Sequence, residues 1–225
     1  MRLSIYLSLI FLICSNLQAK ERPTILFIGD SHSYGKLGLI IETHLLTVSD
    51  HVIMESSCGA TPKTWLGSNG YEKTVCGFWK KDGLSEVRSS EHVTPKLIDE
   101  VRNYKPQITI IQLGTNIAAS SSPKNFKTSI ETMMNLITEA NSLCVWIGPP
   151  DANSNIVTRD KLLETNILIR NLAQDNHCYY IDSLLLTKFP ENNKEGIHYP
   201  PGLSAKWGES VSEILLNYIR NSDLL

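Results

Sequence analysis

A serine, a histidine and a glutamate occur where they could together perform nucleophilic catalysis. Ser31 lies in the stretch FIGDSHS at 27–33, and His198 lies far along the chain, three positions after Glu195. A serine hydroxyl becomes a good nucleophile when a histidine takes its proton, and a carboxylate can hold that histidine in the correct tautomer. Because Gly-Asp-Ser is also a common turn after a strand, and serine a common helix N-cap, Ser31 alone decides little.

Five short apolar runs predict strands that are buried on both faces of a sheet. They lie at 24–29, 51–56, 107–114, 143–148 and 178–182. Between and after them, apolar residues recur with helical spacing, as in Ile130, Met133, Met134 and Ile137, and again in Val211, Ile214, Leu215 and Tyr218. Strands that alternate with helices predict a three-layer α/β/α fold with a five-stranded, mainly parallel sheet in the order 2-1-3-4-5.

The residues that follow the predicted strands are candidates for a binding or catalytic site. In an open parallel sheet, ligands bind beyond the carboxyl ends of the strands, where the strand order reverses. Ser31 follows the first strand, Gly59 the second and Asn116 the third, while Glu195 and His198 lie past the fifth strand, just before the last helix. This rule predicts that residues distant in sequence meet at one edge of the sheet.

Taken together, these blocks resemble the SGNH hydrolases, also called GDSL esterases and lipases, over nearly the whole chain after residue 19. The four residues that name the family correspond to Ser31, Gly59, Asn116 and His198. The resemblance implies a flavodoxin-like fold and an oxyanion hole made by the backbone N–H groups of Ser31 and Gly59 and the side-chain amide of Asn116. The alternative for Gly59 is a turn position that needs positive φ, which is compatible with donation to an oxyanion. The alternative for Asn116 is a turn residue that accepts local backbone hydrogen bonds.

Glu195 departs from the family pattern, because members of the family usually carry aspartate at this position. Glutamate is longer by one methylene and can still orient a histidine, since Ser-His-Glu triads exist on related layered folds. If the side chain of Glu195 points away, a backbone carbonyl would orient the imidazole of His198 instead.

The resemblance implies a serine ester hydrolase that works through an acyl-enzyme and needs no metal or cofactor. The GDSH form of the first block is similar to members that act on acetylated sugars, so we expect removal of O-acetyl groups from a small-molecule or polysaccharide ester. A lipase, lysophospholipase or thioesterase is the alternative within enzymes, and acetyl transfer to a sugar would use the same triad. A noncatalytic carbohydrate-binding relative is the alternative of another class.

Residues 1–19 predict a secretory signal peptide, because Arg2 is followed by the apolar run LSIYLSLIFLIC and a more polar end at Ala19. A retained anchor is the alternative, although a spanning helix needs about 20 apolar residues. We therefore expect a secreted or periplasmic protein without stable membrane insertion. The net charge of -2 and the lack of a Lys/Arg run of five or more argue against a nucleic-acid partner.

Export permits disulfides among the cysteines after residue 19, which are Cys58, Cys76, Cys144 and Cys178. In the predicted strand order Cys144 and Cys178 begin neighbouring strands, which favours their pairing and leaves Cys58 with Cys76; sequence alone does not fix this connectivity, and free buried thiols are the alternative. They have no zinc-ligand spacing.

We expect residues 20–225 to form one domain with an irregular insertion at 60–91. The insertion carries Trp65, Tyr71, Phe78 and Trp79, which could line a pocket wall or form a small aromatic cluster of their own.

Overall fold

The computed structural model describes residues 21–67, 74 and 76–222 of the chain. The predicted signal peptide at 1–19 and Tyr71 lie outside the described residues. None of the helices within these ranges is long and apolar enough to cross a membrane.

The centre of the molecule is a sheet of seven strands in the order β4-β3-β2-β1-β5-β6-β7. Five of them are parallel to one another: β2 (His51–Ser57), β1 (Thr24–Gly29), β5 (Ile108–Gln112), β6 (Leu143–Ile147) and β7 (Tyr179–Ile181). These are the five strands predicted from the apolar runs, in the predicted order. The three-layer α/β/α prediction is therefore confirmed.

The predicted strand number was too low, because an antiparallel hairpin extends the sheet beyond β2. Its strands are β3 (Phe78–Asp82) and β4 (Ser85–Ser89), which lie inside the segment expected to be an irregular insertion. Charged residues occupy much of both strands, so hydrophobicity did not reveal them. The sequence feature that indicates a hairpin here is Asp82-Gly83. Gly83 has a φ of 57° and is the first residue of the two-residue turn between the paired residues Asp82 and Ser85.

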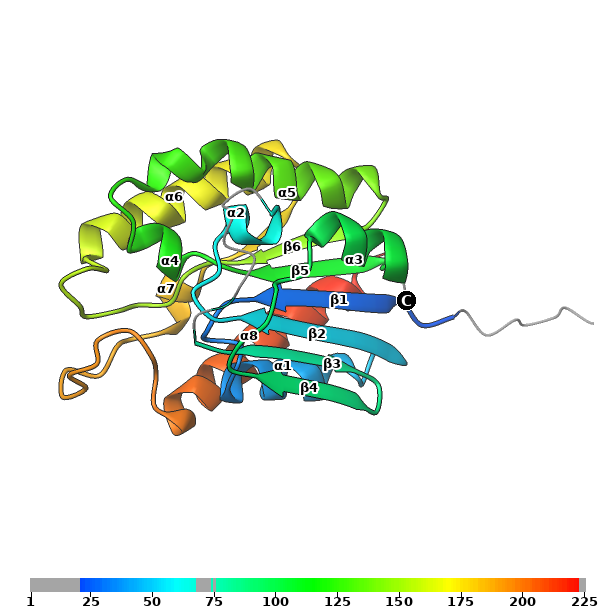
Figure 1. Ribbon diagram of the computed structural model, residues 1–225, viewed down its shortest axis with the longest axis horizontal. Coiled ribbons are helices and arrows are strands. Elements are labelled where there is room, and N and C mark those ends of the chain that lie inside the picture. The colour runs from blue at the N-terminus through cyan, green and yellow to red at the C-terminus, as the bar shows by residue number, and fades with distance from the viewer. Residues whose placement is uncertain (1–20, 68–73, 75, 223–225) are drawn as a thin grey trace, which may run out of the picture.

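Helices cover both faces of the sheet (Figure 1). On one face lie α2 (Pro62–Trp65), α3 (Leu97–Tyr104), α5 (Lys127–Glu139) and α6 (Arg159–Asp175). The other face carries α1 (Lys36–Leu45) and α8 (Pro201–Arg220), which pack against each other. The short helices α4 (Thr115–Ala118) and α7 (Ser183–Leu186) follow β5 and β7, and a 3-10 turn at Pro123–Phe126 precedes α5.

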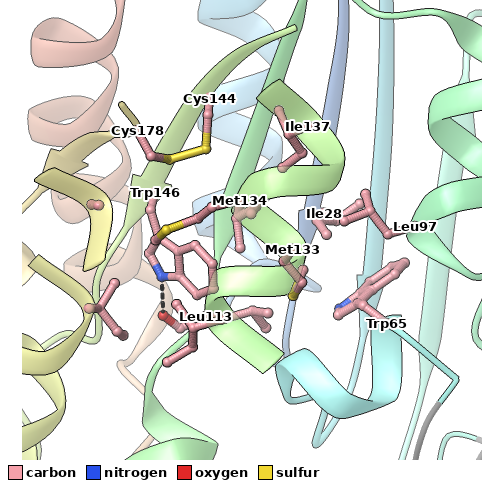
Figure 2. Packing of buried hydrophobic residues seen from close by; sticks show 14 of the residues in the cluster. Ile28, Trp65, Leu97, Leu113, Met133, Met134, Ile137, Cys144, Trp146 and Cys178 are labelled. Atoms are coloured by element: carbon pink, nitrogen blue, oxygen red, sulfur yellow. Dashed lines mark hydrogen bonds between the residues drawn. A yellow bond between two sulfur atoms is a disulfide. The ribbon is translucent and has the colours of Figure 1, made fainter. Parts of the chain in front are cut away.

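The predicted amphipathic faces of the helices are buried against the sheet. Ile130, Met133, Met134 and Ile137 of α5 are fully buried in the core on its side of the sheet (Figure 2). In α8, Val211 and Leu215 are fully buried in the opposite core, with Ile214 and Tyr218 partly buried beside them. Both spacings therefore identified core-facing residues.

The described aromatic residues of 60–91 belong to the main cores and to the sheet edge. Trp65 is fully buried with α3 and α5, as Figure 2 shows, and Trp79 is fully buried with α1 and α8. The ring of Phe78 stacks on His92 with centroids 4.0 Å apart. These three side chains form neither of the arrangements that the sequence suggested. Trp65 belongs to α2, and the hairpin continues the sheet, so Phe78 and Trp79 point to opposite faces of it.

Both predicted cysteine pairings occur in the structure. Cys58 pairs with Cys76 at the carboxyl end of β2, with Cα atoms 5.4 Å apart. Cys144 pairs with Cys178 at the beginning of β6 and β7, with Cα atoms 4.6 Å apart (Figure 2). The two bridges therefore lie at opposite ends of the parallel strands.

Candidate active site

A tight turn directly after β1 presents Ser31. The side chain of Ser33 fixes this turn, because its hydroxyl donates to the carbonyl of Asp30 at 3.0 Å and is hydrogen-bonded to the Ser56 hydroxyl at 2.8 Å. The N–H of His32 donates to Asp30 Oδ1 at 3.0 Å. Helix α1 begins only at Lys36, so Ser31 is not its N-cap and its half-buried hydroxyl is held outside the helix.

His198 is presented by the loop that leads into α8, and Glu195 organises this loop. Glu195 Oε2 accepts the backbone N–H of Ile197 at 2.8 Å and also the backbone N–H of His198. Asn193 closes the loop from the other side, since its Oδ1 accepts the N–H of Glu195 and its Nδ2 donates to the carbonyl of His198. The backbone on both sides of the imidazole is therefore fixed by short polar contacts.

Ser31, His198 and Glu195 form one continuous chain of hydrogen bonds. The Oγ atom of Ser31 lies 2.9 Å from Nε2 of His198, and Nδ1 of the same ring lies 2.6 Å from Oε1 of Glu195. The side chains of His198 and Glu195 are each about half exposed. Thus the Glu195 side chain points toward the imidazole, with one oxygen on the ring and the other on the loop backbone.

The surroundings of Glu195 keep it ionised. Partial burial alone would raise the pKa of this carboxyl. Hydrogen bonds from the backbone N–H groups of His198 and Ile197, and then from the imidazole, outweigh burial and hold the pKa of Glu195 below its ordinary value. A carboxylate in this state can accept the Nδ1–H of His198 and stabilise a positive charge on the ring.

Gly59 and Asn116 lie beyond the neighbouring strands at the same edge of the sheet. Gly59 is exposed in the turn after β2 and has a φ of 77°, a conformation that favours glycine. Asn116 lies in the first turn of α4 and its Nδ2 donates to the carbonyl of Ala60 at 3.0 Å. This hydrogen bond joins two separate loops, so Asn116 does more than close its own turn. The second N–H of its amide is left to donate to another acceptor.

His32 and Thr115 add a buried contact that the sequence reasoning missed. His32 is buried, and its Nε2 lies 3.1 Å from the hydroxyl of Thr115, the residue before Asn116. Its ring lies 5.3 Å from that of His198 and meets Trp207 edge-on. Burial, followed by the charge of His198, lowers the pKa of His32 to about 3, so this imidazole is neutral beside His198.

Asp30 is completely buried next to Ser31. Its Oδ1 accepts the N–H of His32 at 3.0 Å, which places the carboxyl inside the turn. Burial raises the pKa of Asp30 to about 7 even though this N–H bond lowers it. Asp30 therefore supports the turn that presents Ser31.

The rigid turn after β6 packs inside the fold. Trp146 is fully buried, and its indole N–H donates to the carbonyl of Leu113 at 2.9 Å (Figure 2). Pro149 lies so close to Gly114 that a Cβ atom on this glycine would approach the proline Cδ to 2.5 Å. These contacts indicate that the turn supports the loop that carries Asn116.

No group of three or more histidine, cysteine, aspartate or glutamate residues in the described ranges is arranged to hold a metal ion. A mechanism without metal or cofactor stays a prediction from the sequence.

Comparison with known proteins identifies structural relatives only. No model of a protein family matches the sequence, and no curated protein matches it either. Among solved structures, a psychrotrophic esterase from Pseudoalteromonas sp. has 16% identity and a TM-score of 0.59, with 88% of this chain and 99% of the esterase covered.

Two further structures have the same degree of similarity. A carbohydrate acetylesterase from Sinorhizobium meliloti has 14% identity and a TM-score of 0.62, covering 87% of this chain and 99% of that one. A GDSL-like lipase from Bacteroides thetaiotaomicron has 14% identity and a TM-score of 0.61, covering 88% and 87%. The chain therefore has the fold of the GDSL-type, or SGNH, esterases and acylhydrolases, the fold that its motifs predicted.

Proposed function

We propose that this protein is a serine ester hydrolase of the SGNH type. The observation that carries the proposal is the chain of hydrogen bonds from Ser31 Oγ through the His198 imidazole to Glu195, at 2.9 Å and 2.6 Å. The fold shared with esterases and acylhydrolases supports the same conclusion. Fold alone does not define an activity, so the site carries the argument.

The reaction proceeds in two displacements. His198 Nε2 takes the hydroxyl proton as Ser31 Oγ attacks the ester carbonyl, and Glu195 stabilises the imidazolium through Nδ1–H. The imidazolium then protonates the departing alcohol, which leaves an acyl group on Ser31. A water molecule, deprotonated by the same imidazole, attacks this acyl-enzyme and releases the acid.

Three donors stabilise the oxyanion that forms in both displacements. They are the backbone N–H groups of Ser31 and Gly59 and the second N–H of the Asn116 amide, whose first N–H is held by Ala60. All three follow adjacent parallel strands, because β1 pairs with both β2 and β5. Each such donor contributes about 3–4 kcal/mol to transition-state stabilisation in comparable sites.

We propose carbohydrate O-acetyl groups as the substrate class. Two structural neighbours are named carbohydrate acetylesterases, which supports this choice. A deep apolar pocket built by the aromatics of 60–91 would favour the lipid or thioester alternative, but Trp65, Phe78 and Trp79 are buried in the cores and at the sheet edge. A short acyl group needs no such pocket.

We propose a secreted or periplasmic location for the protein, with which the two disulfides agree. An exported enzyme would meet acetylated polysaccharide outside the cytoplasm.

Hydrolysis of nitrophenyl esters from acetyl to decanoyl by protein beginning at Lys20 tests the proposal. The expected result is a maximum at acetyl that disappears in Ser31→Ala, while far-UV and near-UV circular dichroism remain those of the wild type. Ser120→Ala is the matched control, because its hydroxyl bonds only the preceding turn at Ile117. Residual turnover in Ser31→Ala equal to that of the control would refute the mechanism.

Acetylated glycans then separate the substrate classes. Release of acetate from an acetylated xylan or peptidoglycan fragment supports the carbohydrate assignment. A maximum at long acyl chains would transfer the assignment to lipids or thioesters, and acetate appearing on an added sugar acceptor would identify a transferase. Binding of a glycan without any Ser31-dependent reaction would favour a noncatalytic relative.

A further inference from the structure

We propose that the Cys58–Cys76 disulfide positions the oxyanion-hole residue Gly59, so that reduction of this bridge lowers the turnover rate while the protein stays folded. The proposal rests on the proposed esterase function. It assigns the two disulfides different tasks, one near the reacting groups and one in the body of the fold.

The first reason is the position of Cys58 in the turn that presents Gly59. This turn runs from Ser57, the last residue of β2, to Ala60, whose N–H donates to the Ser57 carbonyl at 3.1 Å. Gly59 lies within the turn with positive φ and is directly bonded to Cys58. Any displacement of the Cys58 backbone therefore moves the Gly59 N–H.

The second reason is that the bridge connects this turn to a segment, around Thr74 and Gly77, that is itself held by hydrogen bonds. Cys76 is followed by Gly77, whose carbonyl accepts the N–H of Cys58 at 2.8 Å and the hydroxyl of Thr74 at 2.8 Å. Thr74 is itself held, because its N–H donates to the His92 carbonyl at 2.7 Å. The disulfide joins the Gly59 turn covalently to a segment that the hydrogen bonds already align.

The third reason is that Asn116, another of the proposed oxyanion donors, holds the opposite side of the turn. Asn116 Nδ2 donates to the carbonyl of Ala60, the residue after Gly59. The turn is therefore fixed between the Cys58–Cys76 bridge and Asn116. Loss of the bridge frees one side of the turn and weakens the support of Gly59 and Asn116, two of the three proposed oxyanion donors. Misplacement of such groups by about 1 Å can lower a rate about 100-fold.

The two disulfides also differ in their access to a reductant. Cys76 is exposed and Cys58 is half-buried, whereas Cys144 and Cys178 are only 1% and 6% exposed. A dithiol such as dithiothreitol attacks one sulfur of the exposed bridge, breaks the S–S bond and leaves two protein thiols, while the reagent becomes its own cyclic disulfide. The Cys58–Cys76 bridge should therefore be reduced selectively under native conditions.

The test compares two paired variants that remove one disulfide each. Cys58→Ser/Cys76→Ser removes the bridge beside Gly59, and Cys144→Ser/Cys178→Ser removes the bridge at the other end of the strands. Their cysteines are separated by 18 and 34 positions, so the two losses of loop constraint are comparable. Measurements are kcat and KM on nitrophenyl acetate, well below the melting temperature of either variant.

The expected result is a kcat lower by about 10- to 100-fold in the first pair with KM changed less than about threefold. The second pair should keep its kcat while its melting temperature falls. Wild-type protein treated with dithiothreitol should lose turnover in step with the appearance of free thiols at Cys58 and Cys76, counted by mass after alkylation of withdrawn samples. The reduced protein that has not been alkylated should regain turnover after reoxidation. Near-UV circular dichroism should stay native throughout.

An unchanged kcat with both thiols alkylated would overturn the proposal, as would equal loss of turnover in the two paired variants. If the first pair does not fold, the reversible reduction of wild-type protein decides the question. A wild-type protein that neither hydrolyses an ester nor reacts at Ser31 with a fluorophosphonate refutes the esterase function itself. An active wild type whose turnover does not depend on the bridge refutes only this inference.

Discussion

Glu195 uses both of its oxygens, which explains how a glutamate fits at the position where SGNH hydrolases usually have aspartate. Oε1 lies 2.6 Å from the imidazole Nδ1 of His198, while Oε2 accepts the N–H groups of Ile197 and His198. The extra methylene lets one carboxylate bridge the ring and its own backbone. The motif in the sequence predicted the pairing of these residues but not the second set of contacts, because backbone N–H directions depend on the loop conformation.

Replacing Glu195 with glutamine should lower kcat by about 100- to 10,000-fold, since the amide cannot stabilise the imidazolium and permits the wrong tautomer. KM should change little, because Glu195 does not contact the ester in this mechanism. Steady-state hydrolysis of nitrophenyl acetate checks the result, with Glu191→Gln on the same loop as the control. A kcat within threefold of the control would mean that another group orients His198.

Replacing Asp30 with asparagine should change how stability depends on pH. The native pKa of Asp30 is about 7, raised by burial from an ordinary value of 3.8, so between these values the native state holds a proton that the unfolded state has lost. The free energy of unfolding of the wild type should therefore fall relative to Asp30→Asn as pH rises from about 4 to about 7. The slope is at most about 1.4 kcal/mol per pH unit.

Urea unfolding of both proteins at a series of pH values measures this difference. Above pH 8 the difference should be constant. A difference that is flat across the whole range, or that grows with pH, would contradict the raised pKa of Asp30.

At the scale of elements, the parallel strands were predictable and the hairpin was not. The five parallel strands are continuous apolar runs because both of their faces are buried. In β3, by contrast, Lys80 reaches Glu55 and Glu100 on one face of the sheet, and Lys81 reaches Glu42 on the other. Because these lysines pair with buried carboxylates that are distant in sequence, the sequence alone predicted an irregular insertion where the structure has a strand.

Replacing Lys80 with methionine should lower the free energy of unfolding by about 3 kcal/mol, because two buried carboxylates lose their shared cation. Glu55 is fully buried and Glu100 nearly so, and burial together with the neighbouring Glu100 already raises the pKa of Glu55. Urea denaturation at pH 8 checks the value. Lys124→Met is the control, since that side chain is 79% exposed and its loss should cost less than about 0.5 kcal/mol.

Adding Glu55→Gln to Lys80→Met should restore part of the lost stability, since it removes the unpaired charge. If the double variant is less stable than Lys80→Met, the ion cluster is not the cause of the effect.

At the scale of the whole molecule, the meeting of Ser31 and His198 could be predicted across 167 residues of sequence. The rule that loops gather at the carboxyl ends of parallel strands was sufficient for this. The supporting contacts were not predictable: Thr115 behind His32, Asn193 across the His198 loop and Ala60 against Asn116 each depend on the exact approach of separate loops. Sequence patterns indicate which loops lie together at the carboxyl ends of the strands, but not the distances between the side chains of those loops.

Expression of the full chain in a bacterium with a secretion pathway should yield protein whose first residue is Lys20. The predicted signal peptide ends at Ala19, so cleavage after this residue would leave Lys20 as the first residue. Intact mass and N-terminal sequencing of the periplasmic fraction check this result. Recovery of the uncleaved chain with the membrane fraction would instead support a retained anchor.

The order in which the chain is made has a consequence for when it can react. The nucleophile lies near the beginning, but its base stands directly before α8, which docks on α1 through contacts such as Leu37 N–H to the Ser204 hydroxyl at 3.1 Å. Ribosomes and translocation channels release the amino end first, so a nascent polypeptide exposes Ser31 long before His198 can reach it. Under the proposed mechanism, hydrolytic competence thus arrives only with the final segment, and an unfinished chain in transit is inert toward the esters around it.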